Sequence, residues 1–262
     1  MIDTHAHLDQ VEDLDRILAE ALSCDVQAVM TVGVGLKANQ KNLQIRSRII
    51  SPKIFVALGI HPQSLPEEPV SESLDFIRHN IGYAQAIGEI GLDFWYKHVR
   101  KNDEMKRLQQ DVLARQLELA RESDLPVIIH SRGAWQACLE MVRDFDLDRG
   151  VFHWYSGPLD VLDKILSLGF YISATPSLAY SPQAREAIKY APLAQILMET
   201  DTPVFYKNPD TEDGFAAGPK DVNRTLELLA GLKNVPVKRA LETLDANARQ
   251  LFILKDESGR LL

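Results

Sequence analysis

The feature that most constrains the fold of this chain is an alternation, repeated eight times, between short apolar segments and longer amphipathic ones. The short segments are rich in β-branched residues, as buried strands are, and the longer ones carry apolar residues at helical spacing. We expect strands over residues 2–7, 26–34, 54–60, 84–90, 126–130, 150–153, 170–174 and 195–200. We expect helices over residues 11–23, 39–50, 72–80, 103–123, 134–145, 159–168, 182–190, 221–232 and 237–252.

Strands that alternate with helices pair in parallel, because each parallel connection needs a crossover of a dozen or more residues. Eight such units in 262 residues predict a closed (β/α)8 TIM barrel, folded as one domain over residues 1–262. The alternative is an open, doubly wound sheet. We disfavour it because no strand is followed by a GxGxxG or GxxxxGK[ST] turn.

Five of the eight expected strands end in, or are followed directly by, residue types that bind metals. Barrel enzymes build their sites at the carboxyl ends of their strands, so these side chains should meet at one rim. A single strand-end histidine is more often a core residue than a ligand. A whole set buried together without a cation would cost several kcal/mol. The candidate ligands are His5, His7, Glu89, His130, His153 and Asp201.

This ligand set predicts two divalent ions. Four imidazoles and two carboxylates exceed the three protein ligands of a catalytic zinc, so two ions that share a carboxylate fit better. The absence of thiolate ligands suits Zn²⁺, Mn²⁺, Fe²⁺ or Co²⁺, with Mg²⁺ as a further candidate, and leaves the identity of the ions open.

At these residues the sequence resembles the TatD-type metal-dependent hydrolases, the TatD-related DNase family of the amidohydrolase superfamily. The resemblance covers nearly the whole chain, through the ordered motifs DTHAHLD, GIHP, GEIGLDF, LPVIIHSR, FHWYSG and ETDTP. It implies that the six candidate ligands hold a metal pair with Glu89 as the bridge. It also implies DNase or phosphoesterase activity, often exonucleolytic.

The chain departs from the family pattern at two places. Gln63 stands where the family often has a histidine after GIHP. Residues 207–222 read KNPDTEDGFAAGPKDV, which is acidic where the family often has a basic loop. These departures bear on the substrate more than on the metal chemistry.

Two divalent ions, offset by Glu89, Asp201 and a bridging hydroxide, leave a site of roughly +1 charge that suits an anionic transition state. We expect Glu89 to bridge the ions and Asp201 to accept the proton of the hydroxide. Asp93 could orient a ligand histidine, with a loop cap as the alternative. Residues 97–107 form the one locally basic stretch next to a ligand strand, where any contacts with a phosphate backbone would lie, with a solvated helix start as the alternative. The expected substrate-binding residues are His61, Arg132, Trp154 and Tyr155, with a surface ion pair for Arg132 and rim packing for the aromatic rings as alternatives.

The net charge of −8 excludes a broad basic face, so any contact with nucleic acid must be local. The leading hypothesis is a phosphoesterase or deoxyribonuclease that acts on DNA or a small phosphoester. The alternatives are a hydrolase of a small amide, lactone or ester, and a non-catalytic binding protein stabilised by metal. We see no signal peptide, no apolar run of membrane-spanning length and no sign of an obligate protein partner, and we expect a cytoplasmic protein.

Overall fold

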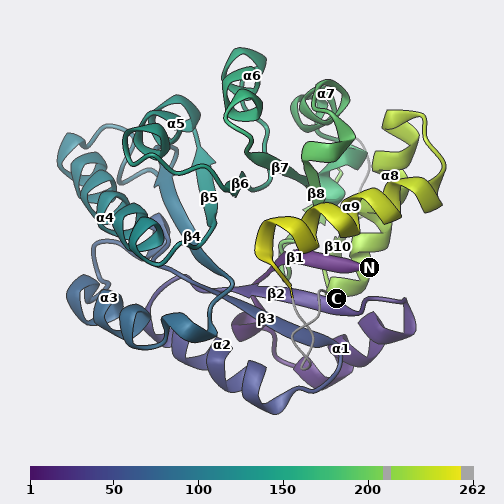
Figure 1. The fold of residues 1–262 in the computed structure, drawn as a ribbon, viewed down its shortest axis with the longest axis horizontal. Helices are drawn as coiled ribbons and strands as arrows, with labels where there is room; N and C mark the ends of the chain where they lie inside the picture. The colour runs from purple at the N-terminus through teal and green to yellow at the C-terminus, as the bar shows by residue number, and fades with distance from the viewer. Residues whose placement is uncertain (209–213, 255–262) are drawn as a thin grey trace.

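A single sheet of eight parallel strands, ordered from β1 to β8 as they occur in the sequence, confirms the predicted TIM barrel (Figure 1). The computed structural model describes residues 1–208 and 214–254. The strands are β1 (Ile2–Ala6), β2 (Ala28–Val32), β3 (Lys53–Leu58), β4 (Ala86–Asp93), β5 (Val127–Arg132), β6 (Gly150–Phe152), β7 (Tyr171–Ala174) and β8 (Ile196–Met198). A separate antiparallel hairpin pairs β9 (Phe205–Lys207) with β10 (Gly214–Ala216).

The helices surround the strands and bury an apolar stripe against them (Figure 1). In the first helix, for example, Leu18 and Ala21 are buried, and the side chain of Asp13 caps the amino end. The helices are α1 (Leu14–Ser23), α2 (Leu36–Arg48), α3 (Val70–His79), α4 (Asp103–Glu122), α5 (Trp135–Asp144), α6 (Leu159–Ser167), α7 (Pro182–Tyr190), α8 (Val222–Lys233) and α9 (Val237–Phe252).

The barrel closes where β1 meets the segment after β8. Ala6 and Thr202 form a parallel bridge, and the Asp201 amide donates to the His5 carbonyl at 3.0 Å. Below this bridge, the Thr200 hydroxyl donates to the fully buried carboxylate of Asp3 at 2.6 Å. Closure therefore places the first predicted ligand pair beside the last predicted ligand.

Strand boundaries differ from the predictions mainly at the ligand positions. β1 ends at Ala6, so His7 lies just beyond the strand, whereas β4 continues past its predicted end at residue 90 to Asp93. The strand register shifts between Asp3 and Ala6, and again between Ile87 and Ile90. Such bulges bend a strand and redirect its side chains, which simple alternation cannot foresee.

The β9–β10 hairpin was not predicted, and residues 209–213 of its connection lie outside the described residues. Within residues 1–208 and 214–254, no helix combines the length and apolar character needed to cross a membrane.

Candidate metal centre

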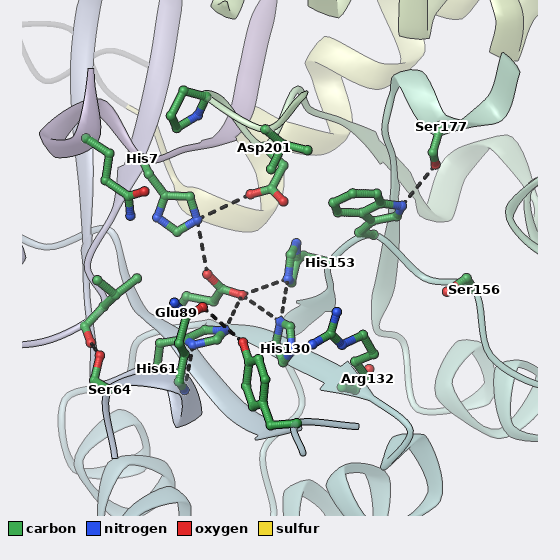
Figure 2. A pocket seen from close by; sticks show the side chains of 18 of the residues that line it. His7, His61, Ser64, Glu89, His130, Arg132, His153, Ser156, Ser177 and Asp201 are labelled. Carbon is green, nitrogen blue, oxygen red and sulfur yellow. Dashed lines mark hydrogen bonds and ion pairs between the residues drawn. The ribbon is translucent and has the colours of Figure 1, made fainter. Parts of the chain in front are cut away.

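A cavity of about 690 Å³ opens at the carboxyl ends of the strands. Five of the six predicted metal ligands line it, and the sixth, His5, is fully buried behind His7 and Glu89. Figure 2 shows the side chain of Glu89 in the middle of a ring of imidazoles. The predicted residues that line the cavity are His7, His61, Glu89, His130, Arg132, His153, Trp154 and Asp201.

One carboxylate oxygen of Glu89 faces three imidazoles. Oε1 lies 2.7 Å from Nε2 of His153, 3.0 Å from Nδ1 of His130 and 3.4 Å from Nε2 of His61. The Nδ1 atom of His130 is also 3.2 Å from Nε2 of His153. Several potential ligand atoms therefore converge on one side of Glu89.

The other oxygen of Glu89 faces the histidines of the β1 end. Oε2 lies 3.3 Å from Nε2 of His5 and 3.5 Å from Nε2 of His7. The same two nitrogens lie 3.4 and 3.2 Å from Oδ1 of Asp201. Glu89 thus stands between two groups of ligand atoms and presents one oxygen to each.

Asp201 and Trp154 occupy unusual backbone positions. Their φ angles are +50° and +41°, in a left-handed region that non-glycine residues rarely adopt. The barrel seam holds Asp201, whose amide bonds His5, while the Trp154 amide donates to the carboxylate of Glu199 at 3.0 Å. Backbone strain of this kind concentrates at functional sites.

Two further carboxylates orient the histidines from behind. Asp93 accepts a hydrogen bond from Nε2 of His130 at 3.0 Å, which leaves Nδ1 directed at Glu89. Glu199 lies 3.3 Å from Nδ1 of His153, which leaves Nε2 directed at Glu89. A carboxylate behind a ligand histidine fixes its orientation and increases its basicity.

His61 differs from the other histidines of the cluster. Its Nδ1 accepts a hydrogen bond from the backbone amide of Gln63 at 2.9 Å, so in the neutral ring the proton resides on Nε2. Burial lowers the pKa of His61 to about 4, and the ring is therefore neutral at pH 7. A ring in this tautomer presents an N–H donor to the cavity.

Arg132 lies at the edge of the cluster. Its Nε donates to Asp93 at 2.8 Å, to the same oxygen that bonds His130. Its guanidinium carbon is 5.0 Å from the centre of the Tyr96 ring, and the side chain is about half exposed. Two contacts hold the planar group, while its outer nitrogens stay available to a ligand.

The two predicted aromatic residues are placed differently. Trp154 lines the cavity, and its indole nitrogen donates to the Ser177 hydroxyl at 2.9 Å (Figure 2). Tyr155 is 1% exposed and does not line the cavity, and its hydroxyl donates to the Pro158 carbonyl at 2.7 Å. The expectation that Tyr155 reaches the mouth is therefore wrong, because its ring packs into the apolar core instead.

The charges of the cluster act on one another strongly. Burial raises the pKa of Glu89, but His61, His153 and His5 outweigh it and hold the value well below the usual range. Burial likewise opposes ionisation of Asp201, yet His7 and His5 bring its pKa to about 2. Both carboxylates are therefore ionised at neutral pH.

Three imidazoles respond in the opposite direction. Burial lowers the pKa of each ring, but adjacent carboxylates outweigh it: Asp201 for His7, Asp93 and Glu89 for His130, and Glu89 and Glu199 for His153. The cluster consequently favours positive charge, which either protons or metal ions can supply.

Four buried ligand atoms have no hydrogen-bond partner among the described residues. They are Nδ1 and Nε2 of His5, Nδ1 of His7 and Oδ1 of Asp201. Buried polar atoms are nearly always satisfied, so such a concentration requires an explanation. The group fits a divalent cation, because its nitrogen and oxygen donors are metal ligands and lie close to one another.

Two glycines leave space for this arrangement. A Cβ atom on Gly59 would lie 2.6 Å from the backbone of Gly88 and 2.8 Å from that of Glu89. Gly91 has a φ of +147°, and its Cβ would lie 1.9 Å from the His130 carbonyl. These close approaches explain why the ligand strands contain glycine here.

Sequence reasoning did not assign Glu199 to the site. It lies two positions before Asp201, and its carboxylate supports His153 from behind. The glutamate of ILMETD could have indicated this role, because a carboxylate that closely follows an apolar strand is expected to be buried and to need a partner. Tyr96 also lines the cavity, where its hydroxyl donates to Oε1 of Gln63 at 3.0 Å.

A TIM barrel whose strand ends gather histidines and carboxylates, several of them with buried atoms that lack hydrogen bonds, has the arrangement of a metal-dependent hydrolase. The chain belongs to the TatD-related DNase family, whose profile matches residues 2–253.

The chain is also similar to several named proteins. The human deoxyribonuclease TATDN3 is 29% identical over 96% of this chain and 94% of its own length. The uncharacterized metal-dependent hydrolase YcfH of Escherichia coli K12 is 30% identical over 96% and 95%. The crystal structure of YjjV, a TatD homolog from Escherichia coli K12, has a TM-score of 0.86 at 28% identity and covers 97% of this chain and 98% of its own.

Proposed function

We propose that this TatD-family hydrolase cleaves phosphodiester bonds of DNA or nucleotides with two divalent cations. The observation that carries the proposal is the position of Arg132 beside the ligand cluster. Arginine binds phosphate through two parallel N–H groups, and here Asp93 and Tyr96 hold the guanidinium in place. The proposed cation ligands are His5, His7, Glu89, His130, His153 and Asp201.

The geometry of Glu89 supports two cations rather than one. His5, His7 and Asp201 would hold one cation with Oε2, while His130 and His153 would hold the other with Oε1. Bound divalent cations would neutralise phosphoryl oxygens and lower the pKa of water toward about 7. A carboxylate suits the shared position because it offers two oxygens, whereas an imidazole offers one lone pair.

The remaining roles belong to the chain's own groups. With its pKa near 2, Asp201 is a carboxylate that can accept a proton from the attacking water and pass it to the leaving oxygen. The neutral ring of His61 offers its Nε2 proton to an oxygen of the phosphate. Arg132 would hold another phosphate oxygen, and Trp154, which also lines the cavity, would contact the substrate.

A second candidate, the hydrolysis of a small amide, lactone or ester, is favoured by the rest of the cavity wall. Arg132 is the one arginine or lysine that lines the cavity within the described chain, and much of the wall consists of hydroxyl groups. These hydroxyl groups come from Ser64, Tyr96, Ser131, Ser156, Ser177, Tyr180 and Ser181. The same cluster would stabilise the oxyanion of a tetrahedral intermediate.

The test compares substrates on protein loaded with Mn²⁺, Zn²⁺ or Mg²⁺. We expect turnover of bis(4-nitrophenyl) phosphate and single-stranded DNA, with little on a panel of small esters and amides. Arg132→Lys keeps the charge but loses the fork, so it should raise KM for phosphodiesters about tenfold. Arg121→Lys, on the exposed face of α4, is the matched control.

Two results would reject the proposal. Turnover of esters or amides alone would favour the second candidate. Full metal occupancy without any turnover would favour the third possibility, a binding protein that uses metal for stability.

A further inference from the structure

The loop between β4 and α4, residues 95–102, has a charge unlike that of the whole chain. Lys97, Arg100 and Lys101 are exposed, while the chain carries a net charge of −8. Within residues 1–208 and 214–254, no carboxylate forms an ion pair with these three side chains. We call residues 95–102 the basic loop.

A continuous series of contacts joins the basic loop to the metal centre. Asp93 bonds both His130 and Arg132, and the Arg132 guanidinium lies over the Tyr96 ring. The ring of Tyr96 stacks in turn on His98, with centroids 5.6 Å apart and planes inclined by 13°. Planar and positively charged groups therefore lead outward from the ligand cluster.

The backbone holds the basic loop in one shape. The amides of Val99 and Arg100 both donate to the Tyr96 carbonyl, at 3.0 and 2.9 Å. Val99 is fully buried and anchors the turn, and Asn102 then caps the amino end of α4. A loop anchored in this way presents its cations at little further cost in conformational entropy.

Trp95 adds an aromatic surface to the same loop. Trp95 is 64% exposed. The ring lies against Gly133, where an added Cβ would approach it to 2.1 Å. The ring is therefore supported on one side and open to solvent on the other.

We propose that the basic loop is the track for single-stranded DNA that leaves the metal centre, with backbone phosphates on Lys97, Arg100 and Lys101 and a base stacked on Trp95. This inference rests on the proposed function and specifies its substrate. Exposed cations beside a stacking ring are the recognition chemistry of single strands, whose bases are free to stack. A duplex would keep its bases paired and away from Trp95.

The test compares two double variants that remove the same charge. Arg100→Ser/Lys101→Ser changes the basic loop, and Lys238→Ser/Arg239→Ser changes exposed cations at the start of α9. Binding of fluorescent single strands of two to eight nucleotides is measured by anisotropy, with a chelator present so that no strand is cut. Hydrolysis of bis(4-nitrophenyl) phosphate by the metal-loaded protein is measured in parallel.

We expect the loop variant to bind the eight-nucleotide strand about 10- to 30-fold more weakly at 0.1 M salt, with a salt slope reduced by about 1.4. Its affinity should rise less with strand length than that of the wild type. Trp95→Ala should weaken binding about tenfold. The α9 variant should match the wild type, and all variants should keep their activity on the small diester.

Equal binding of the single strands by the two double variants would overturn the proposal that the basic loop is the DNA track. A parallel loss of activity on the small diester would also overturn it, because the loop would then act through the metal centre. If the wild type cuts no phosphodiester, the proposed function fails, whereas a selective loss of strand binding in the loop variant still supports the track.

Discussion

The two ends of the barrel differ in how many of their buried polar atoms lack a hydrogen bond among the described residues. At the amino end, the side-chain amide of Asn247 on α9 donates to the carbonyls of Leu193 and Ile196, at 2.9 and 2.8 Å. The first residue of β1 likewise donates its amide to Asp245 of α9. At the carboxyl end, four buried ligand atoms have no such partner among the described residues.

This difference indicates that the two ends of the barrel have different roles. Helix α9 lies against β1 and β8 (Figure 1). Its residues Leu251 and Phe252 belong to one apolar cluster with residues of the barrel strands, such as Met30. At the carboxyl end, several buried nitrogen and oxygen atoms of histidine and aspartate lack hydrogen bonds, which suits a group from outside the chain. The amino end therefore provides stability, and the carboxyl end provides chemistry.

The largest expected effect follows from the shared carboxylate. Glu89→Gln keeps the volume but removes the charge that faces both groups of histidines, so turnover should fall by at least about 10²–10³-fold. Initial rates on bis(4-nitrophenyl) phosphate measure the loss, with metal content determined alongside. Asp245→Asn at the amino end should keep full activity. Comparable losses in both variants would contradict the assignment of stability to the amino end and chemistry to the carboxyl end.

A smaller effect is expected at the carboxylate behind His153. Glu199→Gln removes the charge that orients the ring, and such changes typically weaken metal binding about 10- to 100-fold. Titration with Zn²⁺ by calorimetry would measure the affinity. At saturating metal, kcat should recover most of its wild-type value, whereas a loss that metal cannot rescue would place Glu199 in the reaction itself.

Asn247→Ala tests the amino end. The substitution leaves two buried carbonyls without their donor, which should lower the free energy of unfolding by about 1–3 kcal/mol. Urea denaturation measures the change. The folded variant should keep its metal affinity and turnover, and weaker metal binding would show that the two ends are coupled.

The smallest expected effect is the dependence of protein stability on pH. His7, His130 and His153 have folded pKa values above 6.5, so without metal they add stability below pH 6.5 that is lost as the pH rises through those values. His61, with its pKa of about 4, is neutral in both states above 6.5 and does not oppose this trend.

Asp245 changes stability with pH in the same direction, but in a lower pH range. Burial raises its pKa above 3.8, so the stability that it adds is lost as the pH rises above that value. Thermal melting of metal-free protein from pH 6 to 9 should show the upper decline alone, because at lower pH the lowered pKa values of Glu89 and Asp201 make stability rise with pH and oppose Asp245. With metal bound, the upper decline should reverse, because rising pH removes the protons that compete for the imidazoles.

The sequence predicted the barrel because its eight repeats bury apolar strands between helices, and it predicted the strand-end ligands because barrels place polar residues there. It did not predict the bulges at His5 and Glu89 or the burial of Tyr155. These features depend on contacts between distant strands, such as β1 with the segment after β8. A pattern read along one segment contains no information about such contacts.

The seam between β1 and the segment after β8 also sets an order in time. Thr4 and Met198, which this seam joins by a hydrogen bond, are 194 positions apart in the chain. At about 5–20 residues per second, a ribosome needs about 10–40 s to make the intervening segment. Throughout that interval His5 and His7 exist without Asp201, so the metal centre can be completed only after the eighth strand has been synthesised.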